Sequence, residues 1–171
     1  MNFFLKTQIP ETFPASEKIE VATADESFHV LLSFKDGNLI LQDSKTVLAV
    51  LDPMKLLGPS AFGLLKIRPV SGDGINGDWQ PLVNLVRIPM LKAVRCLPEQ
   101  ETQCTLSGDK LFLLDSVSAD ADFVESVKVP EGFVEDALAI PPPKGKTLYI
   151  KLRDDPSTID TIALPVPQSQ P

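Results

Sequence analysis

Short apolar runs bounded by Gly, Pro or Asp recur along this chain, and most of them are rich in Val, Ile and Leu. Runs of this length and composition are typical of β-strands rather than of helices. Their spacing, with turn residues between them, predicts an all-β protein built as a sandwich or a barrel. The expected strands cover 28–34, 38–42, 46–51, 63–69, 81–88, 91–96, 110–115, 125–130, 136–141, 146–152 and 161–166.

Two details of the pattern concern the first of these strands. Asp36 and Gly37 separate the run 28–34 from the run 38–42, and an Asp-Gly pair between two apolar runs predicts a β-hairpin. Alternate residues of a strand point to opposite faces of its sheet, so His29 is expected on the solvent side of the run.

One stretch predicts a helix, and it is only a single turn long. Asp52 can cap its start, Pro53 takes the first helical position, and Gly58 ends the turn before Pro59. The rest of the chain carries no comparable signal, which agrees with an all-β fold.

Two pairs of segments suggest that the chain contains an internal duplication. The segment 37–44, GNLILQDS, resembles 109–116, DKLFLLDS, at a distance of 72 residues (109 − 37 = 72). The segment 64–69, LLKIRP, resembles 149–154, YIKLRD, at a distance of 85 residues (149 − 64 = 85). Repetition of this kind indicates tandem copies of one small β unit. The expected units are 1–87 and 88–171.

Composition narrows the classes of protein to which the chain can belong. Apolar residues make up 43% of it and charged residues 23%, so we expect a packed core rather than disorder. The net charge of −7 argues against a nucleic-acid partner, because such proteins cluster Lys and Arg to displace counterions. No apolar run approaches the roughly 18–20 residues that span a bilayer, so no membrane span is expected.

The stretch 71–79, SGDGINGDW, carries the most suggestive polar residues. Asp73, Asn76 and Asp78 could supply oxygen ligands to a calcium ion. Asn-Gly and Asp-Gly steps are also ordinary turn chemistry, because both residue types tolerate positive φ. The stretch therefore predicts a loop between two strands, with calcium as the alternative reading of the same residues.

Other residues offer little catalytic chemistry. A Ser or Cys nucleophile would need a base, and the chain has one histidine, His29, which is expected on the solvent side of its strand, so we expect no enzyme activity. Trp79 is the only tryptophan and could form a stacking platform for a sugar or a peptide. The alternative for Trp79 is a plug at the end of a sandwich core.

Cys96 and Cys104 enclose seven residues, a spacing that suits a disulfide closing a hairpin loop. A disulfide would place the protein in an oxidising compartment, outside the cell or on its surface. Two free thiols in a cytoplasmic protein are the alternative. Neither a second nearby cysteine pair nor a nearby histidine accompanies them, so zinc is a poor fit.

The second half of the chain resembles the immunoglobulin-like repeats of the IPT/TIG type, which occur in bacterial surface and secreted proteins. A TLSG-like turn, a hydrophobic strand and a strand that ends in Val-Pro carry the resemblance across 88–166, with a fainter echo across 9–87. The resemblance implies β-sandwich modules that have no catalytic residues and serve as spacers, adhesive surfaces or docking platforms. The matching residues are Thr105, Leu106, Gly108, Leu111, Val117, Val129 and Pro130.

These observations together predict two tandem immunoglobulin-like β-sandwich units with a non-catalytic role. The expected role is binding, adhesion or structure within a larger exported or surface assembly. Loops at the ends of the sandwiches, or exposed edge strands, would contact a protein or carbohydrate ligand. The alternative is a single β-barrel that binds a small ligand or acts as a hydrolase.

Overall fold

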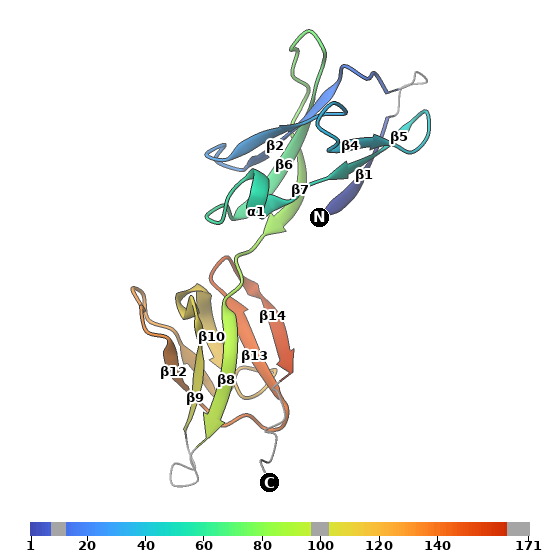
Figure 1. Ribbon diagram of the computed structural model, residues 1–171. Helices are drawn as coiled ribbons and strands as arrows, with labels where there is room; N and C mark the ends of the chain where they lie inside the picture. Colours follow the sequence, from blue (N-terminus) through green and yellow to red (C-terminus); the bar gives the residue numbers. More distant parts are fainter. Residues whose placement is uncertain (8–12, 97–102, 164–171) are drawn as a thin grey trace. The chain divides into compact units, whose positions relative to one another are not determined.

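The computed structural model describes residues 1–7, 13–96 and 103–163. In these residues the chain forms fourteen β-strands, one four-residue α-helix and one short 3-10 helix (Figure 1). Every strand pairing is antiparallel, and the strands fall into four separate sheets. The prediction of an all-β protein is therefore confirmed, while the described strands do not close into a single barrel.

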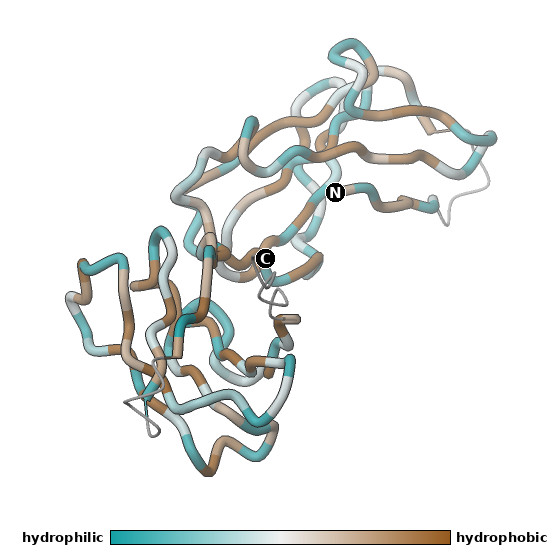
Figure 2. The backbone as a smooth tube through the Cα atoms, turned by 60° about the horizontal axis from the view of Figure 1, so that its bottom comes forward, coloured by the Kyte–Doolittle hydropathy of each residue, from teal (hydrophilic) through white to brown (hydrophobic). Residues whose placement is uncertain are grey.

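The chain divides into two compact units, Met1–Leu85 and Val86–Pro171. Each unit has a hydrophobic core of its own. The sequence places the division after residue 87, two residues further on (87 − 85 = 2). Figure 2 shows short hydrophobic stretches that alternate with hydrophilic ones along the chain. A sheet with one apolar face becomes stable by covering that face with another sheet.

The first unit contains a three-stranded sheet, ordered β1-β5-β4, and a four-stranded sheet, ordered β3-β2-β6-β7. Side chains that alternate along the strands fill the space between the two sheets, among them Val21, Val47 and Leu65. The strands are β1 (Asn2–Lys6), β2 (Lys18–Thr23), β3 (His29–Leu32), β4 (Leu39–Leu41), β5 (Thr46–Val50), β6 (Gly63–Val70) and β7 (Gln80–Leu85).

The helix α1 (Pro53–Leu56) follows β5, where the sequence predicts a single helical turn. The side chain of Asp52 accepts a hydrogen bond from the amide of Lys55 at 3.3 Å, which satisfies one of the free donors at the helix start. Gly58 ends the turn with a positive φ of 87°, a conformation that glycine adopts without steric cost. The predicted cap, first residue and terminator are all confirmed.

The second unit also has a three-stranded sheet, ordered β12-β9-β8, and a four-stranded sheet, ordered β11-β10-β13-β14. Leu106, Val117 and Ile150 are among the buried side chains between them. The strands are β8 (Met90–Cys96), β9 (Cys104–Asp109), β10 (Leu114–Ser118), β11 (Ser126–Lys128), β12 (Ala137–Ile140), β13 (Thr147–Leu152) and β14 (Asp155–Ala163), and the 3-10 helix η1 (Leu111–Leu113) precedes β10.

The strand orders of the two units are related by a circular permutation. Counting in the first unit starts at β4, runs to β7 and then continues from β1 to β3. In this order β4 to β7 correspond to β8 to β11, and β1 to β3 correspond to β12 to β14. The central strand of each three-stranded sheet and the two central strands of each four-stranded sheet then correspond. The two units therefore share one pattern of strand pairing, although the chain enters that pattern at different points.

A simple tandem duplication would repeat the strands in the same order along the chain, and the circular relation between the two units differs from that. In chain order, the matched segments 64–69 and 149–154 fall in β6 and at the end of β13, the inner strands of the final hairpins. The circular relation nevertheless pairs β6 with β10, so these two segments do not occupy equivalent places. The other match fails as well, because Leu39–Leu41 forms β4 whereas Leu111–Leu113 forms a 3-10 helix. Similarity between short apolar segments is thus a poor guide to equivalent positions here.

The predicted hairpin across Asp36 and Gly37 is wrong. β3 pairs with β2, and β4 pairs with β5, so the turn carries the chain from one sheet to the other. The side chain of Ser33 donates a hydrogen bond to Asp36 at 2.6 Å and accepts one from the amide of Asp36 at 3.1 Å. Local turn chemistry is the same in a hairpin and in a crossing between sheets, so it does not identify the partner of each strand.

Candidate binding surface around Trp79

The stretch 71–79 forms the turn between β6 and β7, as the sequence predicts. The amide of Ser71 donates to the carbonyl of Ile75 at 2.9 Å, and the Ile75 amide donates back to the Ser71 hydroxyl at 2.9 Å. A further hydrogen bond runs from the Gly77 amide to the Pro69 carbonyl at 2.8 Å. These bonds close the turn and fix the position at which Trp79 leaves it.

Two glycines of this turn are required by close packing. A Cβ atom on Gly72 would lie 2.7 Å from the hydroxyl of Ser16, and one on Gly77 would lie 2.6 Å from the ring of Pro69. Gly74 has a positive φ of 86°, which few other residues adopt. The glycines therefore serve the turn itself and give no separate indication of a ligand.

The three residues predicted as calcium ligands are exposed side chains of this turn. Asp73 accepts a short hydrogen bond from the hydroxyl of Ser71, and this bond lowers the pKa of its carboxyl group. Asn76 forms an isolated backbone bridge with Val70, and its side chain is exposed, like that of Asp78. Across the described ranges, no three His, Cys, Asp or Glu side chains cluster in a way that could hold a metal ion. The arrangement fits a turn better than a six-ligand calcium site.

Trp79 lies at the surface of the four-stranded sheet of the first unit. The Nζ atom of Lys66 is 4.5 Å from the centre of its ring, and the Cζ atom of Arg68 is 4.3 Å from it. Both basic residues belong to β6 and point to the outer face of the sheet, because Leu65 and Ile67, which alternate with them, face the core. Contact with two cations holds the half-buried indole on this face.

Ion pairs surround the indole and extend across neighbouring strands. Arg68 donates from Nε to Glu20 at 2.7 Å, and Lys66 donates to Glu26 at 2.7 Å. The hydrogen bond from Lys66 lowers the pKa of Glu26. His29 Nδ1 lies 3.4 Å from Glu20, and the histidine side chain is 64% exposed, so its predicted solvent-side position is confirmed.

The same sheet face also exposes apolar side chains. Leu31 lies opposite Glu20 in the pairing of β3 with β2, and Leu64 precedes Lys66 by two residues on β6. Both leucines are exposed. We call the set Glu20, Leu31, Leu64, Lys66, Arg68 and Trp79 the Trp79 surface.

A pocket opens beside the Trp79 surface, within the first unit. Its volume is about 310 Å³, and Arg68 and Gln80 contribute to its wall. The remaining wall includes Leu5 of one sheet, Ile19 of the other, and Phe13 from the segment between β1 and β2. The surface therefore combines an aromatic ring, paired charges and an adjacent apolar recess.

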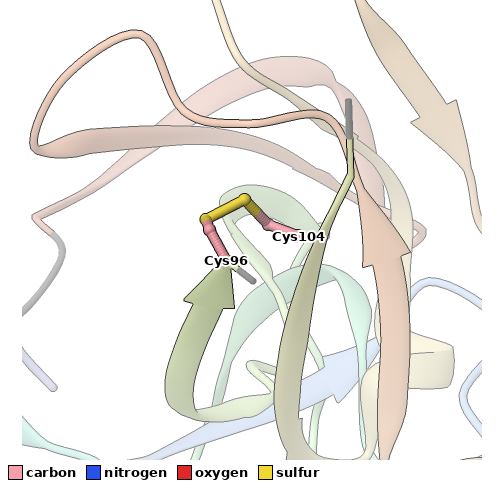
Figure 3. The surroundings of a disulfide bond; sticks show 2 residues. All are labelled: Cys96 and Cys104. Carbon is pink, nitrogen blue, oxygen red and sulfur yellow. A yellow bond between two sulfur atoms is a disulfide. The ribbon is translucent and has the colours of Figure 1, made fainter. Parts of the chain in front are cut away.

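The two cysteines form a disulfide in the second unit (Figure 3). They lie directly opposite each other in the pairing of β8 with β9, with Cα atoms 4.2 Å apart. Cys104 is buried, whereas Cys96 is exposed. The intervening residues 97–102 lie outside the described residues, so the enclosed loop itself stays a prediction.

Sequence reasoning missed two basic residues that organise one end of the second unit. Arg87 donates to Asp154 from its amide at 2.9 Å, from Nε at 2.8 Å and from Nη2 at 2.7 Å. Arg153 donates to the carbonyls of Phe112, Val129 and Pro130 at 2.7–2.8 Å. Arg87 and Asp154 are 67 residues apart in the chain, and no local pattern could have joined them.

A comparison with protein-family models and with curated proteins found no match to this chain. The part of the chain that the structure describes has no helix of the length and apolar character needed to cross a membrane.

Proposed function

We propose that the chain is a non-catalytic module that binds a protein ligand through the Trp79 surface. The observation that carries this proposal is the position of Trp79 on Lys66 and Arg68, on an outer sheet face. Trp and Arg are the residue types that most often dominate the binding energy of protein interfaces. The exposed leucines and the adjacent pocket supply apolar contacts around them.

The charged residues of the surface favour a protein ligand over a carbohydrate. Glu20 and Glu26 already partner Arg68 and Lys66, so the basic groups are held in place rather than left mobile. Held charges of both signs can select a ligand with the complementary arrangement and repel others. A carbohydrate ligand would use the same tryptophan by stacking, and the experiment below separates the two.

We further propose that both units are immunoglobulin-like sandwiches of a larger exported or surface assembly. The second unit supports this with seven antiparallel strands in a three-stranded and a four-stranded sheet. The disulfide between Cys96 and Cys104 supports an oxidising compartment, where such bonds persist. We propose no cofactor, because Asp73 is engaged within its own turn.

The experiment screens the full chain against a displayed peptide library and a glycan array. We expect selected peptides to bind the wild-type protein and to quench its only tryptophan, and we expect Trp79→Ala to lose binding by about tenfold or more. Phe112→Ala, an exposed aromatic residue of the second unit, is the matched control and should bind normally.

Two results would contradict the proposal. If the selected peptides bind Trp79→Ala as tightly as the wild type, the binding site lies elsewhere on the molecule. If glycans bind in a Trp79-dependent manner and no selected peptide does, the ligand of the Trp79 surface is a carbohydrate rather than a protein.

A further inference from the structure

The loop between β10 and β11, residues 119–125, carries an aromatic side chain to the outer face of the second unit's four-stranded sheet. The Nζ atom of Lys151 lies 4.7 Å from the centre of the Phe123 ring. Lys151 belongs to β13 and points outward, because Ile150 and Leu152 on either side of it are buried. The ring of Phe123 therefore lies over the outer face of this sheet.

This loop takes the place of the turn that carries Trp79. β6 and β7 of the first unit correspond to β10 and β11 of the second, so the turn and the loop connect equivalent strands. The turn places the ring of Trp79 4.5 Å from Nζ of Lys66. The loop places the ring of Phe123 against Lys151 in the same manner. Both units thus present an aromatic ring and a lysine at the same place in their strand pattern.

The loop holds Phe123 in a backbone conformation that bulky residues rarely adopt. Its φ is 55°, in the left-handed region. The Phe123 amide donates to the carbonyl of Asp120 at 3.3 Å, and the Asp120 carboxylate accepts from the amide of Val124 at 3.1 Å. Lys144 lies 3.3 Å from the carboxylates of both Asp120 and Glu125, so these two acids of the loop are paired. Backbone strain that the surrounding structure enforces in this way concentrates at ligand sites.

Two lysines on the same outer face have no acidic partner. Lys128 of β11 and Lys151 of β13 both lie opposite Ser116 of β10, so the three residues form one row across three strands. Neither lysine forms an ion pair with any residue in the part of the chain that the structure describes. An acidic ligand can therefore pair with both lysines without displacing a carboxylate of the protein.

The Trp79 surface differs in this respect. Its Lys66 is paired with Glu26, and its Arg68 is paired with Glu20. The charges there are balanced, whereas the row in the second unit carries two positive charges. Complementary charges select the partner of a surface, so the two surfaces suit ligands of different charge.

We propose that Phe123, Val124, Lys128 and Lys151 form a second binding surface, which takes an acidic peptide segment of a partner protein. We call these four residues the Phe123 surface. The lysines receive carboxylates of the ligand, and the Phe123 ring contacts an apolar side chain beside them. Val124, which is 79% exposed, adds apolar surface next to the ring. The inference does not depend on the ligand of the Trp79 surface, because it uses other residues in the other unit.

The spacing of the two lysines sets the spacing of the acidic residues in the ligand. Neighbouring strands lie about 4.8 Å apart, so the backbones at Lys128 and Lys151, two strands apart, are separated by about 10 Å. An extended peptide covers that distance in about three residues. The expected ligand therefore has two acidic residues about three positions apart, with an apolar residue near them. Salt screens exposed charges, so binding should weaken as the ionic strength rises.

A displayed peptide library selected against the full chain carrying Trp79→Ala tests the proposal, because this variant lacks the aromatic ring of the other surface. We expect the selected peptides to have the acidic and apolar residues described above. Isothermal titration calorimetry then measures their affinity. Replacing both Lys128 and Lys151 by Gln should raise the dissociation constant by about tenfold or more.

Phe123→Asn tests the role of the ring. Asn tolerates a positive φ, so the substitution removes the ring while the loop keeps its conformation, and binding should weaken. Lys55→Gln, at an exposed lysine of the first unit, is the matched control and should bind normally. Circular dichroism checks that every variant is folded.

Three results would overturn the proposal. The first is a selection that yields no peptide whose binding depends on Lys128 and Lys151. The second is equal binding of the selected peptides after their acidic residues are replaced by Asn or Gln. The third is binding of inorganic sulfate to the two lysines when no peptide binds there, since the row would then be a simple anion site. Loss of all Trp79-dependent binding, with these peptides still bound, would reject the function proposed for the Trp79 surface and leave the Phe123 surface in place.

Discussion

The carboxylate of Asp154 is buried and paired with Arg87 in the second unit. Its side chain is 3% exposed, and it accepts three hydrogen bonds from Arg87. A buried charge without its partner would cost several kcal/mol, so this pair is required once the carboxylate is buried. It ties the residues before β8 to the turn between β13 and β14.

Asp154→Asn should therefore lower the free energy of unfolding of the second unit by about 1.5–3 kcal/mol, the usual contribution of hydrogen bonds to a charged group. The substitution keeps the size of the side chain and removes its charge. Urea denaturation measures the change. Asp109→Asn is the control, because Asp109 pairs with Lys92 at an exposed position, where an ion pair contributes little. Equal losses in the two variants would contradict the assigned role of Asp154.

The same pair predicts a dependence of stability on pH. Burial raises the pKa of the Asp154 carboxyl, but the hydrogen bonds from Arg87 outweigh burial and the net pKa is lowered. A carboxyl in an unfolded chain has a pKa of about 3.9. Because the pKa in the folded unit is lower, the pair stabilises the unit fully at pH values above the unfolded pKa. This stabilisation is lost as the pH falls through the folded pKa.

Urea denaturation of wild type and Asp154→Asn at a series of pH values tests this dependence. The difference between the two proteins should be full near neutral pH and should shrink in acid, below the unfolded pKa. A difference that stays constant down to the lowest pH at which both fold would rule out the proposed linkage.

At the scale of single residues, the sequence predicts covalent and turn-forming roles better than it predicts which side chains touch. The disulfide between Cys96 and Cys104 follows from their spacing, because strands joined by a short loop bring such residues opposite each other. The contacts of Trp79 with Lys66 and Arg68 depend on how the turn 71–79 returns the chain onto β6. That geometry is set by hydrogen bonds within the turn, and residue types alone do not specify it.

The hairpin of β8 and β9 is the element most constrained by a covalent bond. Replacing both Cys96 and Cys104 by Ala should lower the free energy of unfolding by about 2.5 kcal/mol, because the unfolded chain gains the entropy of an open loop. Urea denaturation of the double variant measures the loss. Reduced wild-type protein should match the variant approximately, and equal stability of the reduced and oxidised wild type would contradict the prediction.

Most strands could be predicted from the sequence, but their partners could not. The runs 46–51, 63–69 and 146–152 become β5, β6 and β13 with small changes at their ends. The run 110–115 is divided instead, because Lys110 adopts a positive φ and the chain turns through η1 before β10 begins. Apolar alternation reports which side of a strand is buried, and it contains no information on the neighbouring strand.

The whole molecule consists of two units, each with a core of its own. We expect residues 1–85 and 86–171, produced separately, to fold and to unfold cooperatively. Thermal unfolding followed by circular dichroism tests this expectation. A piece that ends at residue 62 is the control, since it lacks β6 and β7 and leaves β2 without its central partner. Failure of either unit to fold alone would show that the two depend on each other.

The circular relation between the strand orders has a consequence for the speed of folding. In the first unit, β1 pairs with β5 and β2 with β6, so that Phe4 meets Leu48 across 44 residues (48 − 4 = 44). The corresponding sheets of the second unit join residues that are closer in the chain, such as Leu106 and Leu138 at 32 (138 − 106 = 32). Longer loops must close before the first unit gains its pairings, and such topologies fold more slowly.

The chain carries its own probe of that difference. Its only tryptophan lies in the first unit, so fluorescence after dilution from denaturant follows the first unit alone, whereas far-ultraviolet circular dichroism follows both. The slower kinetic phase in circular dichroism should coincide with the fluorescence phase, and the faster one should belong to the half that lacks tryptophan.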